Sequence, residues 1–387
     1  MTKKHDENAP ISAKKFMDEL WRYKQGSVSR RHFLGVTGLG TAMAVMGSAV
    51  PSLMPRPAHA AKLSDRMVLA TWPNYHNPKT LEAFTAATGV HIQANVFGSN
   101  EEMIAKMQAG GGAADVIENT NYTFEDYVKL GLLTPLDLSR IPNYDASTQN
   151  PKFAEASTVG GKVYGVCKNW GTTGLVINSK KIKNVPKSHK DFFDITMGAG
   201  SGHTILHDYQ LTTIGAALCA LGYSFNSVDA GELAKAEKLL IDSKPHLFAI
   251  TSDYQPGMRS GDAWMSICWS GDGLQLNRDL PEMKYVVASD GGELWSDFYS
   301  IPKDAPSADT AYAFVNYMMD PKNQVLDAEA HGYPTSDSRV AAMQPDSVRT
   351  NPILFPAKEL FDGLEFGAAV TLTDPIRAEV MARFKSA

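Results

Sequence analysis

The segment 67–133 alternates short apolar runs with helical spacing, and this alternation most limits the folds open to the chain. Residues 67–70 form a short apolar run, and 90–96 alternate apolar with polar side chains. A helix-like pattern follows each run, and 116–117 begins the cycle a third time. A repeated strand–helix order predicts a parallel sheet with helices on both faces.

Helix ends in this segment can be read from their caps. Asn77 precedes Pro78, a residue favoured at the first helical position, and Gly89 follows the last turn. Ser99 and Glu102 have the spacing of a capping box at the start of a second helix. A third helix is expected over 124–133.

A second α/β series follows this segment. The expected elements are strands at 162–166, 174–178 and 264–269, and helices at 211–221, 230–240 and 308–319. Two such series predict an α/β chain of two lobes with several crossings between them. Ligands of such sheets bind beyond the carboxyl ends of strands, so we expect a cleft between the lobes.

The first sixty residues predict export. Arg30 and Arg31 precede Phe33 and an apolar run of 16 residues, 35–50, and the segment closes on Ala58-His59-Ala60. This is the pattern of a twin-arginine signal peptide with a small-residue cleavage site. We expect residues 1–60 to be removed near Ala60 and the protein to work in the periplasm. The alternative is a retained anchor, but a spanning helix needs ~20 strongly apolar residues.

Charge and cysteine content exclude some classes of function. Beyond residue 60 the chain has 28 Lys and Arg against 38 Asp and Glu, a net charge of −10. This argues against a nucleic-acid partner and is compatible with a cationic ligand, although it also keeps an exported protein soluble. Cys167, Cys219 and Cys268 have apolar neighbours, so we expect buried thiols. No motif indicates a metal, a cofactor or a catalytic nucleophile.

Aromatic residues follow the expected strands. They are Trp72, Tyr75, Tyr122, Trp170, Trp269, Trp295 and Tyr333. Any one of them could belong to a core. Two are close to a carboxylate, because Asp272 follows Trp269 by three residues and Asp297 follows Trp295 by two. An aromatic face beside a carboxylate suits an alkyl ammonium group, through cation–π attraction and a charged hydrogen bond.

Over most of 65–375 the chain resembles the extracellular solute-binding proteins of polyamine ABC transporters, of the spermidine/putrescine type. The resemblance rests on motifs in order: Thr71-Trp72-x-x-Tyr75, Gly98-Ser99-Asn100-Glu101, Ala114-Asp115-Val116, Gly131-Leu132-Leu133-Thr134-Pro135-Leu136-Asp137, Leu221-Gly222-Tyr223-Ser224, Trp269-Ser270-Gly271, Gly291-Gly292-x-x-Trp295-x-Asp297 and Gly332-Tyr333-Pro334-Thr335.

The resemblance implies a periplasmic binding protein fold, with lobe 1 formed by 61–171 and 297–339 and lobe 2 by 172–296 and 340–387. It implies no enzymatic activity and no cofactor. The expected partners are a small cationic amine and the membrane permease of an ABC transporter, and we expect a monomer. By position, the implied ligand-binding residues are Trp72, Tyr75, Thr120, Tyr122, Asp208, Ser252, Trp269, Trp295, Asp297 and Tyr333.

The chain departs from the family at one end of the expected pocket. Polyamine binders have an acidic cluster where 206–212 retains one carboxylate, Asp208, and has Leu211 or Thr212 in place of a glutamate. A glutamine expected near the C-terminal end aligns with 366–367. An unpaired buried charge is costly, so this end favours a shorter or mono-cationic ligand.

Other interpretations stay open. The same fold could bind 4-aminobutyrate, another amino-acid-like compound, an opine, a sugar derivative or a quaternary amine, and Arg259 is a candidate partner for a ligand carboxylate. Iron binding would need adjacent tyrosines, which the sequence lacks. An exported cofactor-dependent enzyme is a more distant alternative, because no cofactor motif is present.

Overall fold

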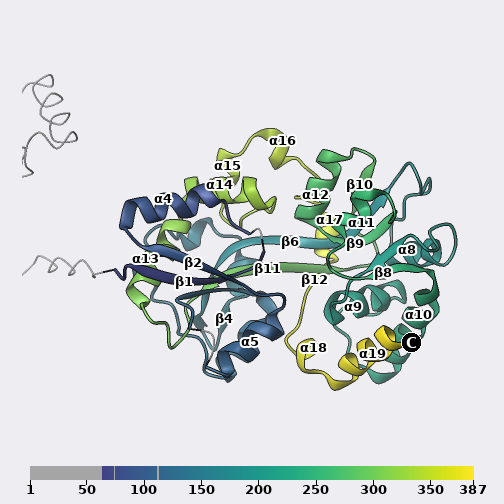
Figure 1. The fold of residues 1–387 in the computed structure, drawn as a ribbon, viewed down its shortest axis with the longest axis horizontal. Coiled ribbons are helices and arrows are strands. Elements are labelled where there is room, and N and C mark those ends of the chain that lie inside the picture. Colours follow the sequence, from purple (N-terminus) through teal and green to yellow (C-terminus); the bar gives the residue numbers. More distant parts are fainter. Residues whose placement is uncertain (1–62, 74, 111–112) are drawn as a thin grey trace, which may run out of the picture. The chain divides into compact units, whose positions relative to one another are not determined.

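The computed structural model describes residues 63–73, 75–110 and 113–387. The expected signal peptide, 1–60, lies outside these residues. The described chain forms one mixed sheet with helices packed against it (Figure 1).

The main sheet has ten strands. They are β1 (Arg66–Thr71), β2 (His91–Val96), β3 (Val116–Thr120), β6 (Gly165–Asn178), β7 (Thr204–Leu206), β8 (Leu247–Ile250), β9 (Met265–Trp269), β10 (Met283–Val286), β11 (Glu293–Ser300) and β12 (Glu365–Phe366). The order along the sheet is β2-β1-β3-β11-β6-β9-β7-β8, with β10 paired to β6 and β12 to β11. A separate hairpin joins β4 (Thr158–Val159) to β5 (Lys162–Val163).

Sixteen helices are described. They are α4 (Pro78–Thr88), α5 (Asn100–Gln108), α6 (Phe124–Lys129), α7 (Pro151–Glu155), α8 (His189–Thr196), α9 (Gln210–Ala220), α10 (Ala230–Ser243), α11 (Gln255–Ser260), α12 (Ser270–Asp279), α13 (Ala308–Met318), α14 (Pro321–His331), α15 (Ser338–Met343), α16 (Asp346–Arg349), α17 (Lys358–Asp362), α18 (Val370–Thr373) and α19 (Pro375–Ser386). Within the described part of the chain, no helix is long and apolar enough to span a bilayer.

The expected α/β pattern is confirmed. β1 pairs in parallel with both β2 and β3, and β7 pairs in parallel with β8 and β9. The predicted caps are present: the Asn77 side chain accepts from the Lys79 amide, Gly89 adopts φ +78° after α4, and the Ser99 hydroxyl accepts from the Glu102 amide. The third helix, expected to reach residue 133, ends at Lys129, and Gly131 at φ +67° turns the chain toward the next segment.

The two strands expected at 162–166 and 174–178 are mainly one strand. β6 continues through 14 residues that are all buried, and it is antiparallel to β11, β9 and β10. The pattern between the expected strands hides this continuity, because Lys168, Asn169, Thr172 and Thr173 are polar. The sheet buries these side chains because each finds a polar partner there.

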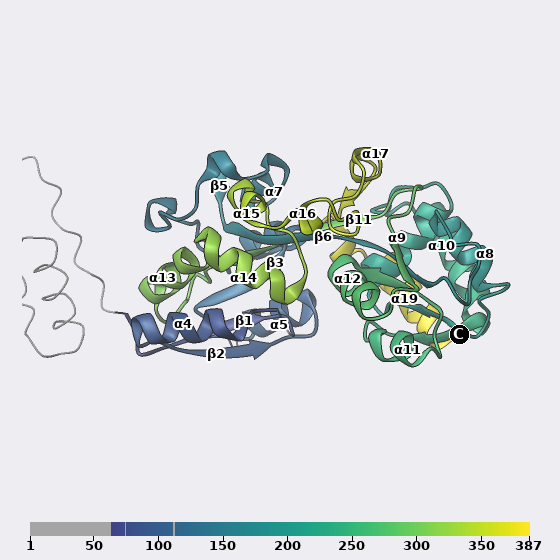
Figure 2. The ribbon, with the colours of Figure 1, turned by 90° about the horizontal axis from the view of Figure 1, so that it is seen from above.

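β6 and β11 connect the two parts of the sheet. Figures 1 and 2 show them passing from the part that contains β1 and β3 to the part beside α9 and α10. Their pairing has one irregularity: Asp297 lies opposite Asn169 and Phe298 opposite Cys167, so Lys168 is an extra residue on β6. Such a bulge re-aims the side chains around it.

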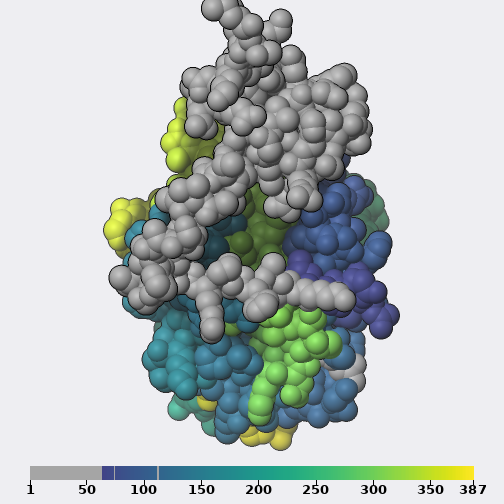
Figure 3. Space-filling view, turned by 90° about the vertical axis from the view of Figure 1, so that its left-hand side faces the viewer, coloured from purple at the N-terminus to yellow at the C-terminus, as the bar shows by residue number. Residues whose placement is uncertain are grey.

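α13 is fixed to the segment that follows α6. The Tyr312 hydroxyl accepts from the Asp137 amide, and Asn143 donates two hydrogen bonds to Asn316, from its backbone and side-chain amides. In Figure 3 the green surface of α13 lies beside blue surface from this part of the chain. The apolar core below α13 includes Phe314 and Val315, which are fully buried.

α19 is held by a buried arginine. The Arg377 side chain is fully buried and donates to the backbone carbonyls of Phe225, Ser227 and Leu211 at 2.9–3.3 Å. Burial lowers the pKa of this guanidinium to about 10. The contact with Leu211 joins the last helix to the start of α9.

We predict that Arg377→Met lowers the free energy of unfolding by about 2–4 kcal/mol. The substitution leaves buried backbone carbonyls without their hydrogen-bond donor, which lowers stability. It also removes a buried charge, and this gain offsets part of the lost stability. Urea denaturation measures the change. Arg383→Met on the same helix is the control, since Arg383 is exposed, and it should leave the midpoint within error. Equal midpoints for the two variants would contradict the role of Arg377.

Candidate ligand-binding site

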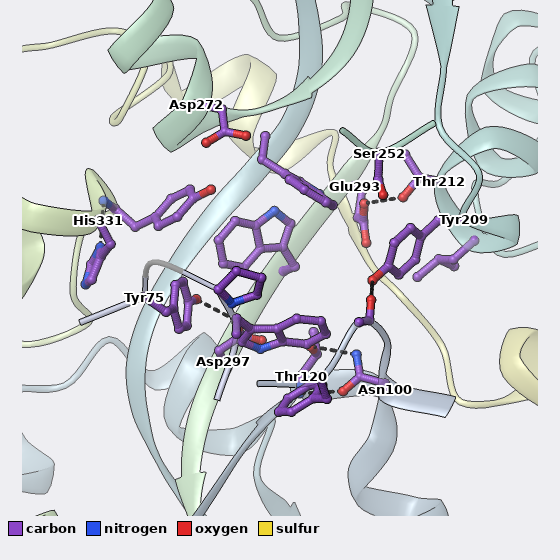
Figure 4. Close-up of a pocket in the computed structure, with 18 of the residues that line it drawn as sticks. Tyr75, Asn100, Thr120, Tyr209, Thr212, Ser252, Asp272, Glu293, Asp297 and His331 are labelled. Carbon is purple, nitrogen blue, oxygen red and sulfur yellow. Dashed lines mark hydrogen bonds between the residues drawn. The ribbon is translucent and has the colours of Figure 1, made fainter. Parts of the chain in front are cut away.

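A cavity of about 500 Å³ opens where the two parts of the sheet meet. Trp72 follows β1, Thr120 ends β3, Ser252 follows β8 and Trp269 ends β9, and all four line the cavity. The site therefore lies at the carboxyl ends of parallel strands, as the sequence predicts. Figure 4 shows the residues that surround it.

Nine of the ten ligand-binding residues implied by the resemblance line this cavity. They are Trp72, Tyr75, Thr120, Tyr122, Ser252, Trp269, Trp295, Asp297 and Tyr333. They come from segments as far apart as β1 and the residues after α14. The fold thus brings these side chains to a single cavity wall.

Asp208 is the exception. Its side chain is exposed, does not line the cavity, and accepts a hydrogen bond from the Ser252 amide at 3.0 Å. It therefore positions the backbone of a lining residue. A direct contact between Asp208 and a ligand stays a prediction.

β11 supplies the centre of the wall. Alternate residues of a strand point to the same face, so Glu293, Trp295 and Asp297 all face the cavity. Their partners on β6 are Thr173, Gly171 and Asn169 respectively. Gly171 leaves room for the indole, because a Cβ there would lie 2.4 Å from Trp295 Cζ2.

Asp297 is buried yet incompletely hydrogen-bonded. Its Oδ2 accepts from the Tyr75 hydroxyl at 2.6 Å, whereas Oδ1 has no partner among the described residues. Burial raises the pKa of this carboxyl to about 6, and the Tyr75 hydroxyl partly offsets that rise. An ammonium group donating to Oδ1 would supply both the hydrogen bond and the counter-charge.

Aromatic rings form the walls on either side of this carboxylate. The Trp295 and Tyr333 rings meet edge to face at 4.9 Å, and Tyr333 also contacts Tyr75. The indole nitrogens of Trp72 and Trp295 are buried and have no acceptor within the described part of the chain. These rings offer apolar and cation–π contacts to an alkyl ammonium chain.

The sequence reasoning missed several polar residues of the wall. They are Asn100, Tyr209, Thr212, Asp253, Gln255, Gln275, Glu293 and His331, together with Asp272, which was noticed only for its closeness to Trp269. Two of them organise the wall: Asn100 donates to Thr120 and Tyr122 at 2.9 Å, and Tyr209 donates to the Gly98 carbonyl at 2.5 Å. The alternation of residues 293, 295 and 297 along one strand is the signal that could have revealed Glu293.

A buried network of charged groups lies behind Tyr75. Lys168 Nζ donates to Asp327 at 2.7 Å and to the Tyr75 carbonyl at 2.9 Å. His76 lies 2.5 Å from Glu118 and 3.1 Å from Asp327. Burial alone would raise the pKa of Asp327, but the Lys168 ammonium outweighs it and holds this pKa well below its usual range. The network fixes the backbone that carries Tyr75, and so positions the hydroxyl that contacts Asp297.

Metal and thiol chemistry have little support. Residues 63–73, 75–110 and 113–387 contain no group of three His, Cys, Asp or Glu side chains arranged to hold a metal ion. All three cysteines lie in the described part and are free and buried, which confirms the expectation of buried thiols. Burial raises the pKa of each of these thiols, which keeps them protonated and unreactive.

Comparison with known proteins places this geometry in a family. The sequence profile of the family described as bacterial extracellular solute-binding protein matches residues 79–356. The putrescine-binding periplasmic protein SpuD of Pseudomonas aeruginosa is 28% identical over 325 residues, covering 79% of this chain and 88% of SpuD. The spermidine/putrescine-binding periplasmic protein of Escherichia coli is 26% identical over 332 residues, covering 85% and 94%.

Solved structures agree with these matches. The crystal structure of the spermidine/putrescine ABC transporter substrate-binding protein PotD from Streptococcus pneumoniae has a TM-score of 0.72 and 28% identity. The match covers 84% of this chain and 99% of that one. The chain belongs to the bacterial extracellular solute-binding protein family. The expected two-lobed binding-protein fold is confirmed, and the chain is a solute-binding protein rather than an enzyme.

We predict that Gly171→Ala weakens solute binding at least tenfold while the fold is kept. The new methyl group would collide with the Trp295 ring and displace it from the cavity wall. Calorimetry with putrescine or spermidine, the solutes named for the relatives, measures the loss. Gly257→Ala is the control, because its Cβ would come no closer than 3.2 Å to any atom and Gly257 does not line the cavity. Unchanged affinity in Gly171→Ala would contradict a ligand contact at Trp295.

Proposed function

We propose that this protein is the periplasmic substrate-binding component of an ABC importer, and that it captures a polyamine such as putrescine or spermidine. The observation that carries the proposal is Asp297 Oδ1, a buried carboxylate oxygen that faces the cavity without a partner among the described residues. The names of the relatives support the same solute class.

The charge of the cavity wall supports a cationic ligand. Asp253, Asp272, Glu293 and Asp297 line it, and the lining residues include no Lys or Arg. His331 is the remaining titratable base of the wall, and burial lowers its pKa well below the usual range, which keeps it neutral. An ammonium group therefore meets several acceptors and no competing cation.

A ligand with its own carboxylate fits less well. 4-Aminobutyrate would need a cation for its carboxylate end, and Arg259 was the candidate. Arg259 instead donates to Gln255 and Asp279 and does not line the cavity. Lys168 is buried behind Tyr75 and paired with Asp327. A quaternary amine lacks the N–H group that Asp297 Oδ1 requires.

The proposed lobes are 61–171 with 297–339 and 172–296 with 340–387. Two of the three boundaries, 171/172 and 296/297, fall within β6 and β11, the two strands that run from one part of the sheet to the other, and the third, 339/340, falls within α15. The Tyr209 hydroxyl, from the second proposed lobe, donates to the Gly98 carbonyl of the first. The protein would act as a monomer that closes on its ligand and then docks on the permease.

Asp297→Asn should cost about 2–5 kcal/mol of binding free energy, because it removes one member of a buried charge pair. The measurement is titration calorimetry on protein freed of copurified ligand, with putrescine, spermidine, 4-aminobutyrate and a quaternary amine. We expect the wild type to bind one or both polyamines and neither of the others tightly. Asp304→Asn, an exposed site outside the cavity, is the matched control.

Two outcomes would contradict the proposal. A wild type that binds neither polyamine would overturn the solute class, and unchanged affinity in Asp297→Asn would overturn the ammonium site. Asp208→Asn in the same series tests the remaining predicted contact: a loss comparable to that of Asp297→Asn would place Asp208 at the ligand.

The proposed route of export is the twin-arginine pathway, with cleavage near Ala60. Replacing Arg30 and Arg31 together by lysine should move the protein from the periplasmic to the cytoplasmic fraction, uncleaved, because the pathway recognises the arginine pair. Immunoblots of cell fractions measure this. Arg22→Lys, outside the pair, is the control and should be exported normally. Normal export of the double variant would exclude this route.

A further inference from the structure

A second buried carboxylate faces the cavity from the other end of β11. Glu293 is 4% exposed, and its Oε2 accepts from the hydroxyls of Thr173 at 2.6 Å and Thr212 at 3.2 Å. The other oxygen, Oε1, receives no hydrogen bond from the described residues, and Figure 4 shows the carboxylate at the cavity wall beside Ser252 and Tyr209. Half of this group is thus held rigidly, and half is open to a ligand.

No cation within the described part of the chain balances Glu293. Its neighbours on β6, α9 and β11 are the two threonines and Asp297, and the phenols of Tyr122, Tyr209 and Tyr285 are close enough to interact with its charge. Burial raises the pKa of Glu293 to about 7 and the Asp297 carboxylate adds to that rise, although the two threonine hydroxyls partly offset it. A buried anion without a counter-ion is costly, so a ligand that brings positive charge is strongly favoured there.

The spacing of the two carboxylates along β11 sets the distance that a ligand bound to both must span. Glu293 and Asp297 are four residues apart on one face, which corresponds to about 13 Å along the strand. If an ammonium lies ~2.8 Å inside each carboxylate, roughly 7 Å remain between the nitrogens. The five bonds of about 1.5 Å between the nitrogens of a four-carbon diamine zigzag to roughly 6 Å, and the nine bonds between the terminal nitrogens of spermidine zigzag to roughly 11 Å. An extended diamine therefore nearly spans the gap and a bent triamine spans it, so both polyamines can present an ammonium group to each carboxylate.

We infer that Glu293, together with Thr173 and Thr212, forms a second ammonium subsite, so that the cavity holds a polyamine by one ammonium group at Asp297 and another at Glu293. The Trp295 ring lies between the two subsites and covers the methylene chain. This inference rests on the proposed function and adds to it the residue that binds a second ammonium group. It also revises the sequence-based expectation that one end of the pocket is poor in charge. Glu293 supplies a carboxylate there, and it comes from β11 instead of from residues 206–212.

The test compares the wild type with Glu293→Gln, in calorimetry with spermidine and with putrescine. Glutamine keeps the shape and an acceptor for the threonines, so the variant should unfold at a temperature no lower than that of the wild type. We expect Glu293→Gln to lose at least tenfold in affinity for each polyamine that the wild type binds, because a carboxylate that pairs with an ammonium group is removed. Glu329→Gln, exposed and outside the cavity, is the control and should change neither.

The number of protons released on binding is a second measurement. It would not change in Glu293→Gln if this glutamate had only a structural role. An ammonium binds the ionised carboxylate, so spermidine binding at pH 6.5 should expel protons from Glu293 and Asp297 in the wild type. Glu293→Gln should expel fewer, as measured in two buffers of different ionisation enthalpy.

Two results would overturn the inference: unchanged polyamine affinity in Glu293→Gln, or unchanged proton release in that variant. These differ from failure of the proposed function, in which the wild type binds neither polyamine.

Discussion

The pairing of β6 with β11 is the constraint on which the rest of the site depends. These two strands are antiparallel neighbours in the middle of the sheet; β11 pairs with β3 of one part, and β6 pairs with β9 and β10 of the other. One face of β11 therefore runs along the cavity and presents Glu293, Trp295 and Asp297 in a row. Gly171, opposite Trp295, gives the indole the space that any side chain would fill. The β6–β11 pair therefore forms the centre of the cavity wall, and the loops complete the wall around it.

The charged groups on the two sides of Tyr75 differ in whether they have a partner of opposite charge. Behind it, Lys168, Asp327, His76 and Glu118 satisfy one another, so these buried charges are structural. In front of it, the cavity carboxylates have no cationic partner among the described residues. The bulge at Lys168 makes this separation possible, since the extra residue on β6 sends its ammonium away from the cavity and toward α14. This contrast between paired and unpaired carboxylates indicates that the cavity carboxylates are available to a cationic ligand.

Much of the fold and part of the site were predictable. Helix ends at Asn77, Gly89 and Ser99 follow local capping rules, and these are independent of tertiary context. The continuity of β6 was not predictable, because its middle is polar and polar residues in a row indicate a loop. Glu293 was missed for a related reason: a resemblance to a family directs attention to positions that the family uses, whereas this carboxylate is visible only through the two-residue period of β11.

The sequence by itself determined the class of fold, the order of the elements and the aromatic and acidic side chains that follow the strands, because strand and helix periods and caps are local properties. Only the tertiary structure decided which carboxylates have partners. Asp208 and Asp297 are the same residue type, yet the first is exposed beside Ser252 while the second is buried with an oxygen free. The burial of a carboxylate and the number of hydrogen-bond donors around it depend on residues distant in the chain. Together they set the free-energy cost of a buried negative charge, which a cationic ligand lowers.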